Sequence, residues 1–117
     1  MKDYEKMKDQ LLVEKFLNEK DHKAYQVLYY RYYNAIKNLV GRITKNDIYK
    51  DDLTQEVFIK VFKNLATYNP HYNFLNWIYK IATITTIDFI RKKNKINIES
   101  IEKLNQEGEI FTSTVPY

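Results

Sequence analysis

Aromatic and cationic side chains gather in one stretch of the sequence, residues 72–95. Rings that could stack on nucleic-acid bases come first, and cations that could neutralise phosphates follow them. The rings are Tyr72, Phe74, Trp77 and Tyr79, and the cations are Arg91, Lys92, Lys93 and Lys95. An element that offers both within a few helical turns suits a nucleic-acid strand with some bases unstacked. This stretch is therefore the candidate nucleic-acid-binding element.

The charges of the chain are unevenly distributed. Its formal net charge is +4 and its pI about 9.1. Residues 73–95 alone have a net charge of +4, from five cations and the single carboxylate of Asp88. Residues 47–56 are acidic instead, with Lys50 as their one cation. Such a split favours two differently charged partners, although two solvated helix faces would give the same pattern.

Composition argues against several classes of protein. A chain of 117 residues builds one modest core, so we expect a single domain with tails. The absence of cysteine excludes a disulfide framework and a thiol metal site. No run of about 18 apolar residues occurs, and the N-terminus lacks a signal-peptide pattern, so we expect a cytoplasmic protein without membrane insertion.

Signatures of catalysis are absent from the sequence. His22 and His71 stand apart from other ligand residues, and no glycine-rich loop is present. Asp51 and Asp52 are adjacent, so on a helix they point about 100° apart and form no acid–base pair. We expect no enzyme activity, no cofactor and no metal site.

Helices dominate the expected fold, because only two glycines and two prolines interrupt the chain. A short first helix is expected over residues 9–18. Asp21 is the expected N-cap of a second helix, with Arg31 near the edge of its apolar face. That face contains Val27, Leu28, Ala35, Ile36, Leu39 and Ile43.

A third helix is expected from an N-cap at Asp47 to about Ala66. Its apolar stripe contains Leu53, Val57, Phe58, Val61, Phe62 and Leu65. The opposite face contains Asp52, Gln55, Glu56, Ile59 and Lys63. Ile59 is unusual there, because an apolar residue among charges indicates a contact surface, although single exposed isoleucines are common.

A fourth helix is expected from Phe74 to Lys93, after a loop that includes Pro70. The expected organisation is therefore an all-α, compact bundle of about four helices. It comprises a short N-terminal helix in residues 1–20, a main domain in residues 21–96, and a linker or tail in residues 97–117.

Four motifs in a fixed order carry a family resemblance. They are AYQVLYYRYY at 24–33, DLTQEVF at 52–58, WIYKIA at 77–82 and IDFIRKK at 87–93. Together they resemble region 2 of bacterial sigma factors, and they are most similar to the extracytoplasmic-function (ECF) group of the sigma-70 family. The resemblance covers residues 21–95, and the ordered set is far more specific than any one motif.

The resemblance implies a protein partner for the acidic helix. In the family, this helix docks on the coiled-coil clamp of the largest subunit of RNA polymerase core. The residues implied are Asp52, Gln55, Glu56 and Ile59. Charges would steer docking and the isoleucine would be buried on contact. The alternative is a solvated face with a Glu56–Lys60 pair, worth about 0.2–0.5 kcal/mol.

The resemblance also implies contacts with the non-template strand of the minus-ten promoter element, from which the family flips a base. The base pocket implied contains Lys60, Asn64, Tyr68, Asn73 and Tyr79. Contacts along the helix are implied for Lys80, Thr83, Thr86, Arg91, Lys92 and Lys93. Trp77 is interpreted as core. The basic end of the helix also suits the helix dipole without DNA.

Ile84 departs from the family pattern, and Asp88 needs an ion-pair partner if it is buried. The family has an asparagine where this chain has Ile84, so a hydrogen-bonding amide is missing there, and Thr83 or Thr85 replaces it only in part. Asp88 lies among apolar neighbours in the sequence, where an unpaired buried carboxylate would be costly. We expect Arg31 to be its structural ion-pair partner.

Alternatives remain open at this stage. The chain could be a helical protein-interaction module that does not bind DNA, or, less favoured, a duplex reader of the helix-turn-helix type. Nothing after Lys95 resembles the family's second DNA-binding domain, region 4, so we expect a fragment rather than a natural single-domain variant. The resemblance further implies an anti-sigma factor as a partner.

Overall fold

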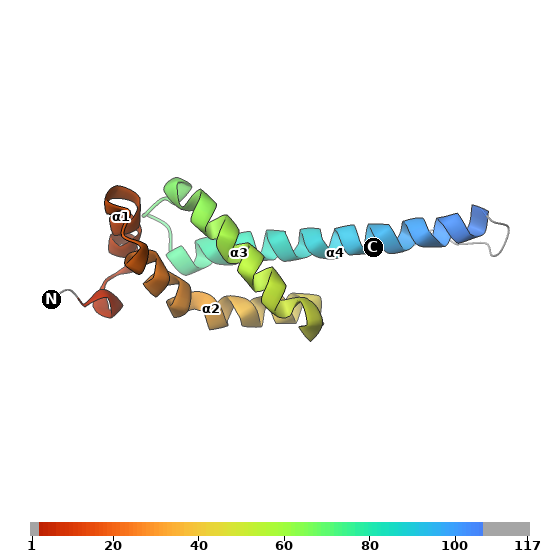
Figure 1. Cartoon of the computed structure of the whole chain (residues 1–117), viewed down its shortest axis with the longest axis horizontal. Coiled ribbons are helices and arrows are strands. Elements are labelled where there is room, and N and C mark those ends of the chain that lie inside the picture. Colours follow the sequence, from red (N-terminus) through yellow and green to blue (C-terminus); the bar gives the residue numbers. More distant parts are fainter. Residues whose placement is uncertain (1–2, 107–117) are drawn as a thin grey trace.

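Four α-helices form the fold of the computed structural model, which describes residues 3–106 and the side chains of residues 3–95. They are α1 (Asp9–Glu19), α2 (His22–Thr44), α3 (Lys50–Asn64) and α4 (Phe74–Gln106). Short 3-10 turns η1 (Tyr4–Lys6), η2 (Asp47–Tyr49) and η3 (Leu65–Thr67) complete the order. The all-α prediction is confirmed. Helix α2 packs against α1, α3 and α4, and α3 also packs against α4 (Figure 1).

The start of α2 follows the sequence prediction. The side-chain oxygen Oδ1 of Asp21 accepts hydrogen bonds from the backbone N–H groups of Lys23 at 3.1 Å and Ala24 at 3.3 Å. The Tyr4 hydroxyl donates to Oδ2 of the same carboxylate at 2.6 Å. This bond, followed by the two backbone donors, lowers the pKa of Asp21 although burial opposes the shift. Asp21 therefore caps α2 and attaches η1 to it.

The start of α3 differs from the prediction. The N-cap of α3 is Tyr49, which makes no side-chain capping hydrogen bond. Asn46 caps the preceding turn η2, because its Oδ1 accepts from the N–H of Ile48 at 2.9 Å. Asp47 instead begins η2, and α3 ends at Asn64 before the separate turn η3. Asp is a favoured N-cap residue, so the sequence indicated a helix start at Asp47 and did not reveal the separate turn before α3.

The apolar stripe of α3 is buried at five of its six predicted positions. The exception is Phe62, which is 42% exposed. Its ring packs edge-on against Phe16 at a centroid distance of 5.1 Å and against Tyr25 at 5.2 Å. Phe62 thus extends the core onto the surface between α1, α2 and α3.

Helix α4 begins at Phe74 as predicted, and Asn73 caps it by accepting from the N–H of Asn76 at 3.0 Å. The predicted end at Lys93 is wrong, because the helix continues to Gln106. No glycine or proline stands between Pro70 and Gly108, so nothing in the sequence forces an earlier end. Residues 97–106 of the predicted linker or tail are therefore helical, and residues 107–117 lie outside the described part. Figure 1 shows α4 extending past the other three helices.

The predicted pair between Arg31 and Asp88 is also wrong. Arg31 donates from Nη1 to the Asp9 carboxylate at 2.7 Å, and it reaches the carbonyl oxygens of Met7 and Glu5, each at 3.0 Å. Asp88 is exposed on α4, where water solvates its carboxylate and no partner is required. Arg31 instead fastens the N-terminal turn to α2.

The core is almost entirely apolar. Among the described side chains, the largest ones that are fully buried include Leu12, Leu28, Ile36, Leu65 and Ile78. None of the helices in the described part is sufficiently long and apolar to span a bilayer.

Candidate nucleic-acid and protein interfaces

The acidic face of α3 is exposed as predicted. Asp52, Gln55, Glu56 and Ile59 are all exposed, and Ile59 is exposed by 53%. Gln55 donates from Nε2 to the Tyr29 hydroxyl at 2.8 Å. Glu56 lies 4.0 Å from the Lys60 ammonium, the exposed type of ion pair that contributes about 0.3–0.5 kcal/mol. The four residues form one exposed surface on α3.

Two carboxylates near this surface, those of Asp47 and Asp51, are partly neutralised by ion pairs with lysines. Asp51 binds the Lys37 ammonium at 2.9 Å, and this hydrogen bond raises the pKa of Lys37. Asp47 binds Lys50 at 3.2 Å. Within residues 3–95, Asp52 forms no ion pair. Among these carboxylates the charge is therefore least neutralised at Asp52 and at Glu56, whose contact with Lys60 is long at 4.0 Å.

An apolar groove adjoins this face between α2 and α3. Its volume is about 240 Å³, and it is lined by Tyr25, Tyr29, Gln55, Phe58, Ile59 and Phe62. Burial raises the pKa of Tyr25 to about 12, so its hydroxyl stays protonated and donates to the Phe58 carbonyl oxygen at 2.9 Å. Gln55 and Ile59 belong to both the groove and the acidic face, so one partner could cover both.

The residues implied for a base pocket are only partly available. Tyr68 is 6% exposed, its hydroxyl donates to the Tyr72 carbonyl oxygen, and its ring contacts those of Phe74 and Trp77 at 5.1 and 5.2 Å. Burial raises the pKa of Tyr68. In this conformation Tyr68 is part of the core, so its expected role as an exposed stacking ring needs correction. The same contacts place Trp77 against the core, as interpreted.

The other implied pocket residues have mixed surroundings. Lys60 and Tyr79 are half-buried, whereas Asn64 and Asn73 are exposed. The Asn64 amide donates to the Lys60 carbonyl oxygen at 2.8 Å, and the Asn73 side chain caps α4. Both amides thus already have a structural role.

Tyr72 is an aromatic residue of the same loop that the implied pocket does not include. It is 65% exposed, in a turn that is closed by its own N–H donating to the Asn69 carbonyl oxygen at 2.9 Å. Asn69 also accepts from the N–H of His71 through its side chain at 2.9 Å. The Asn-Pro pair in the sequence signals such a turn, which places the following aromatic residue at the surface.

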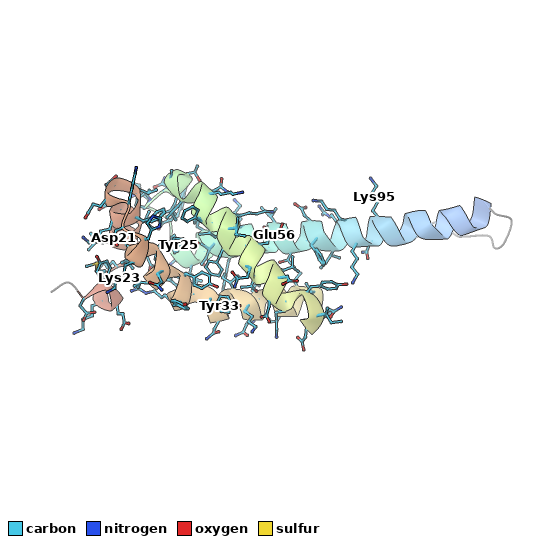
Figure 2. The ribbon with its side chains drawn as sticks, viewed as in Figure 1. Asp21, Lys23, Tyr25, Tyr33, Glu56 and Lys95 are labelled. Carbon is cyan, nitrogen blue, oxygen red and sulfur yellow. The ribbon has the colours of Figure 1, made fainter. Side chains whose placement is uncertain are left out.

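The outer face of α4 holds several of the predicted contacts. Lys80, Arg91, Lys92 and Lys95 are exposed, and Thr83 is half-buried. Figure 2 shows Lys95 on the part of α4 that extends beyond the bundle and Glu56 on α3. Positive charge and negative charge are thus presented by different helices.

Two predicted contacts on α4 need revision. Thr86 is fully buried, because it lies one turn after Ala82 on the core side of the helix, so it cannot contact DNA in this conformation. Lys93 is half-buried, and its ammonium lies 4.1 Å from the centre of the Tyr49 ring. That ring packs against Phe89 at 5.0 Å. Lys93 therefore contributes to packing between η2 and α4.

Comparison with known proteins identifies this arrangement. The family model described as Sigma-70 region 2 matches residues 28–96. The ECF RNA polymerase sigma-E factor of Haemophilus influenzae is 33% identical over 92 residues, which cover 78% of this chain and 47% of that protein. The sigma-E factor of Escherichia coli K12 is 32% identical over 109 residues, covering 89% of this chain and 56% of that protein. The chain thus spans about half the length of these curated relatives.

A solved structure agrees with the fold. It is the NMR structure of an engineered region 2 of sigmaE in complex with GTAAAA. The TM-score is 0.70 at 29% sequence identity, and the match covers 81% of this chain and 96% of the other.

Proposed function

Because the chain belongs to the sigma-70 region 2 family, in its ECF group, we propose that it acts in transcription initiation by binding RNA polymerase core and recognising and melting the minus-ten promoter element. The observation that carries this proposal is the pairing of an exposed aromatic loop with a cationic helix face, at Tyr72 and along α4. The chain would perform no covalent chemistry itself, since polymerase supplies the catalysis.

The acidic face of α3 is the proposed docking surface for the basic clamp of the largest core subunit. The charges of Asp52 and Glu56 would steer encounter, as unscreened surface charges do. Ile59 would lose its water on contact, and the groove beside it would accept an apolar side chain of the clamp. An anti-sigma factor that covers the same face would compete with core, and we propose this as the mode of regulation.

Tyr72 and the outer face of α4 are the proposed DNA contacts. An exposed ring can stack on an unpaired base, which contributes about 1–3 kcal/mol. Lys80, Arg91 and Lys92 would hold the backbone, a contact that positions the strand without reading its sequence. Lys60 and Tyr79 remain proposed members of a base pocket beside the loop.

In this proposal, the chain melts the promoter duplex because it binds one separated strand more tightly than it binds the duplex. Flipping a base costs a few kcal/mol of unstacking, which stacking on Tyr72 and hydrogen bonds would offset. A protein that binds the open state more tightly shifts the equilibrium toward it. This account requires no energy source other than binding.

A direct test of DNA binding uses the single-stranded hexamer GTAAAA, named in the related structure. Tyr72→Ala should weaken binding about fivefold or more, as measured by fluorescence anisotropy, because one stacked base is lost. Tyr30→Ala is the matched control, since Tyr30 is 67% exposed on α2, away from the loop. Equal affinities for Tyr72→Ala and the unmodified chain would remove Tyr72 from the interface.

Docking on core is tested by charge reversal. Glu56→Lys should weaken binding to purified RNA polymerase core at least tenfold, because a favourable charge contact becomes repulsive. Glu14→Lys is the control, since Glu14 is exposed on α1. If both variants bind core equally well, the docking surface lies elsewhere. A helical interaction module without DNA binding would instead keep core binding and show no affinity for the hexamer.

A further inference from the structure

An exposed isoleucine interrupts the polar outer face of α4. Ile84 is 53% exposed, and the half-buried Ile87 follows it by almost one turn. Lys80 is exposed one turn before Ile84 and Arg91 two turns after it. A single exposed isoleucine is ordinary on a protein surface. Its place between two cations of the proposed DNA-binding face is what distinguishes Ile84.

The charges around Ile84 determine which part of a DNA strand can approach it. Lys80 and Arg91 lie about 6 Å and 10 Å from Ile84 along the helix axis, so they can hold phosphates on either side of it. Asp88 is exposed one turn after Ile84, and its carboxylate repels a phosphate placed directly above. The strand would thus be anchored at its flanks, with a base edge rather than a phosphate facing Ile84.

The chemistry of the side chain restricts what that base can be. Isoleucine has neither hydrogen-bond donor nor acceptor, so it cannot read the nitrogen and oxygen atoms of base edges. The C5 methyl group of thymine is the one apolar group that the four bases display on their major-groove edges. Contact between this methyl group and Ile84 would remove both from water, which is favourable.

We propose that Ile84 contacts the C5 methyl group of a thymine in the bound DNA and so gives the chain a preference for thymine at one position. This inference rests on the proposed function, because it requires that α4 binds DNA through Lys80 and Arg91. It makes Ile84 a specificity-determining residue that acts by apolar contact.

Deoxyuridine provides the test, because it differs from thymidine only by the missing methyl group. The hexamer GTAAAA and variants with thymine at each adenine position in turn are compared with their deoxyuridine counterparts. Binding to the full 117-residue chain is measured by fluorescence anisotropy at low salt. At one position, thymine should bind about threefold to fivefold more tightly than deoxyuridine, the effect expected for burial of one methyl group.

Two variants assign the effect to the side chain. Ile84→Ala should abolish the difference between thymine and deoxyuridine, and its surface position means that the fold is kept, which a thermal melt verifies. Leu11→Ala is the matched control, because Leu11 has a side chain of the same size and is 42% exposed, but lies on α1; it should retain the difference.

The outcomes separate this inference from the proposed function. If the unmodified chain binds the hexamers but never distinguishes thymine from deoxyuridine, the inference fails and DNA binding stands. A preference for thymine that survives in Ile84→Ala also refutes it. If the chain binds none of the hexamers, the proposed function fails, and the inference fails with it.

Discussion

The hydroxyl group of Thr86 has no hydrogen-bond partner, and within residues 3–95 it is the one buried side-chain polar atom in that condition. Thr54 provides a contrast on α3, because it is equally buried but donates to the Lys50 carbonyl oxygen at 2.7 Å. Leaving a buried hydroxyl unpaired costs about 1–3 kcal/mol, whereas a made bond contributes about 0.5–1.5 kcal/mol. Two threonines with the same exposure thus have opposite energetic effects.

Replacing each threonine by valine tests this difference, since valine has the same shape without the hydroxyl. Thr86→Val should raise the free energy of unfolding by about 1 kcal/mol, and Thr54→Val should lower it by about the same amount. Urea denaturation followed by circular dichroism measures both. A loss of stability in Thr86→Val comparable to that in Thr54→Val would mean that the Thr86 hydroxyl has a partner in solution.

The backbone is strained at the ends of helices α1 and α2. Lys20 after α1 and Lys45 after α2 adopt left-handed backbone conformations, with φ of 54° and 55°. The Lys45 N–H donates to the Gly41 carbonyl oxygen at 2.9 Å, which closes the end of α2. This conformation costs an L-residue about 1–2 kcal/mol and glycine almost nothing. The chain thus ends two helices with a residue type that does not favour the geometry.

Lys45→Gly should therefore stabilise the protein by about 0.5–1 kcal/mol, the relief of strain less the larger entropy that glycine loses on folding. Lys80→Gly is the control in the interior of α4, where glycine should destabilise by about 0.5–1 kcal/mol. Thermal unfolding of both variants gives the comparison. A lower melting temperature for Lys45→Gly would show that the lysine side chain contributes to the cap.

Sequence patterns predicted the positions of the helices more accurately than the side-chain contacts between them. The apolar periodicity of α3 and the capping side chain of Asp21 are local features, so the sequence indicates them directly. The true partner of Arg31 is Asp9, 22 residues away, and such a pairing depends on how α1 and η1 fold back on α2. No local pattern contains that information.

In the candidate site, too, the sequence alone does not show which side chains are exposed. Tyr68 and Tyr72 are both aromatic residues of one loop, but only Tyr72 is exposed, and the packing of Phe74 and Trp77 decides which ring is buried. The family resemblance implies a DNA contact for Thr86, whereas its burial places it in the core. Exposure at such positions is set by neighbouring helices, which the sequence of α4 alone does not specify.

At the scale of the whole molecule, charge is divided between two helices. Helix α3 presents Asp52 and Glu56, and the outer face of α4 presents Lys80, Arg91 and Lys92. The proposed function, in which one domain holds a basic protein surface and an acidic nucleic acid together, needs such a division, because each face would repel the other's partner. The net charge of +4 is therefore less informative than its distribution.

The salt dependence of DNA binding tests whether that distribution matters. Each phosphate contact on a single strand contributes about 0.7 to the slope of the logarithm of affinity against the logarithm of salt concentration. Lys80→Ala and Arg91→Ala should each reduce the slope by roughly this amount, and the double variant by about twice as much. Anisotropy titrations of the hexamer at several salt concentrations give the slopes.

Lys23→Ala is the control, because it removes the same charge from an exposed position on α2, outside the proposed DNA interface. Its slope should equal that of the unmodified chain, since a distant charge releases no counterions from the bound strand. Lys93→Ala should have a smaller effect than Arg91→Ala, because the Lys93 ammonium lies over the Tyr49 ring. If Lys23→Ala reduced the slope as much as Arg91→Ala, DNA would respond to the net charge of the chain, and the outer face of α4 would have no special role.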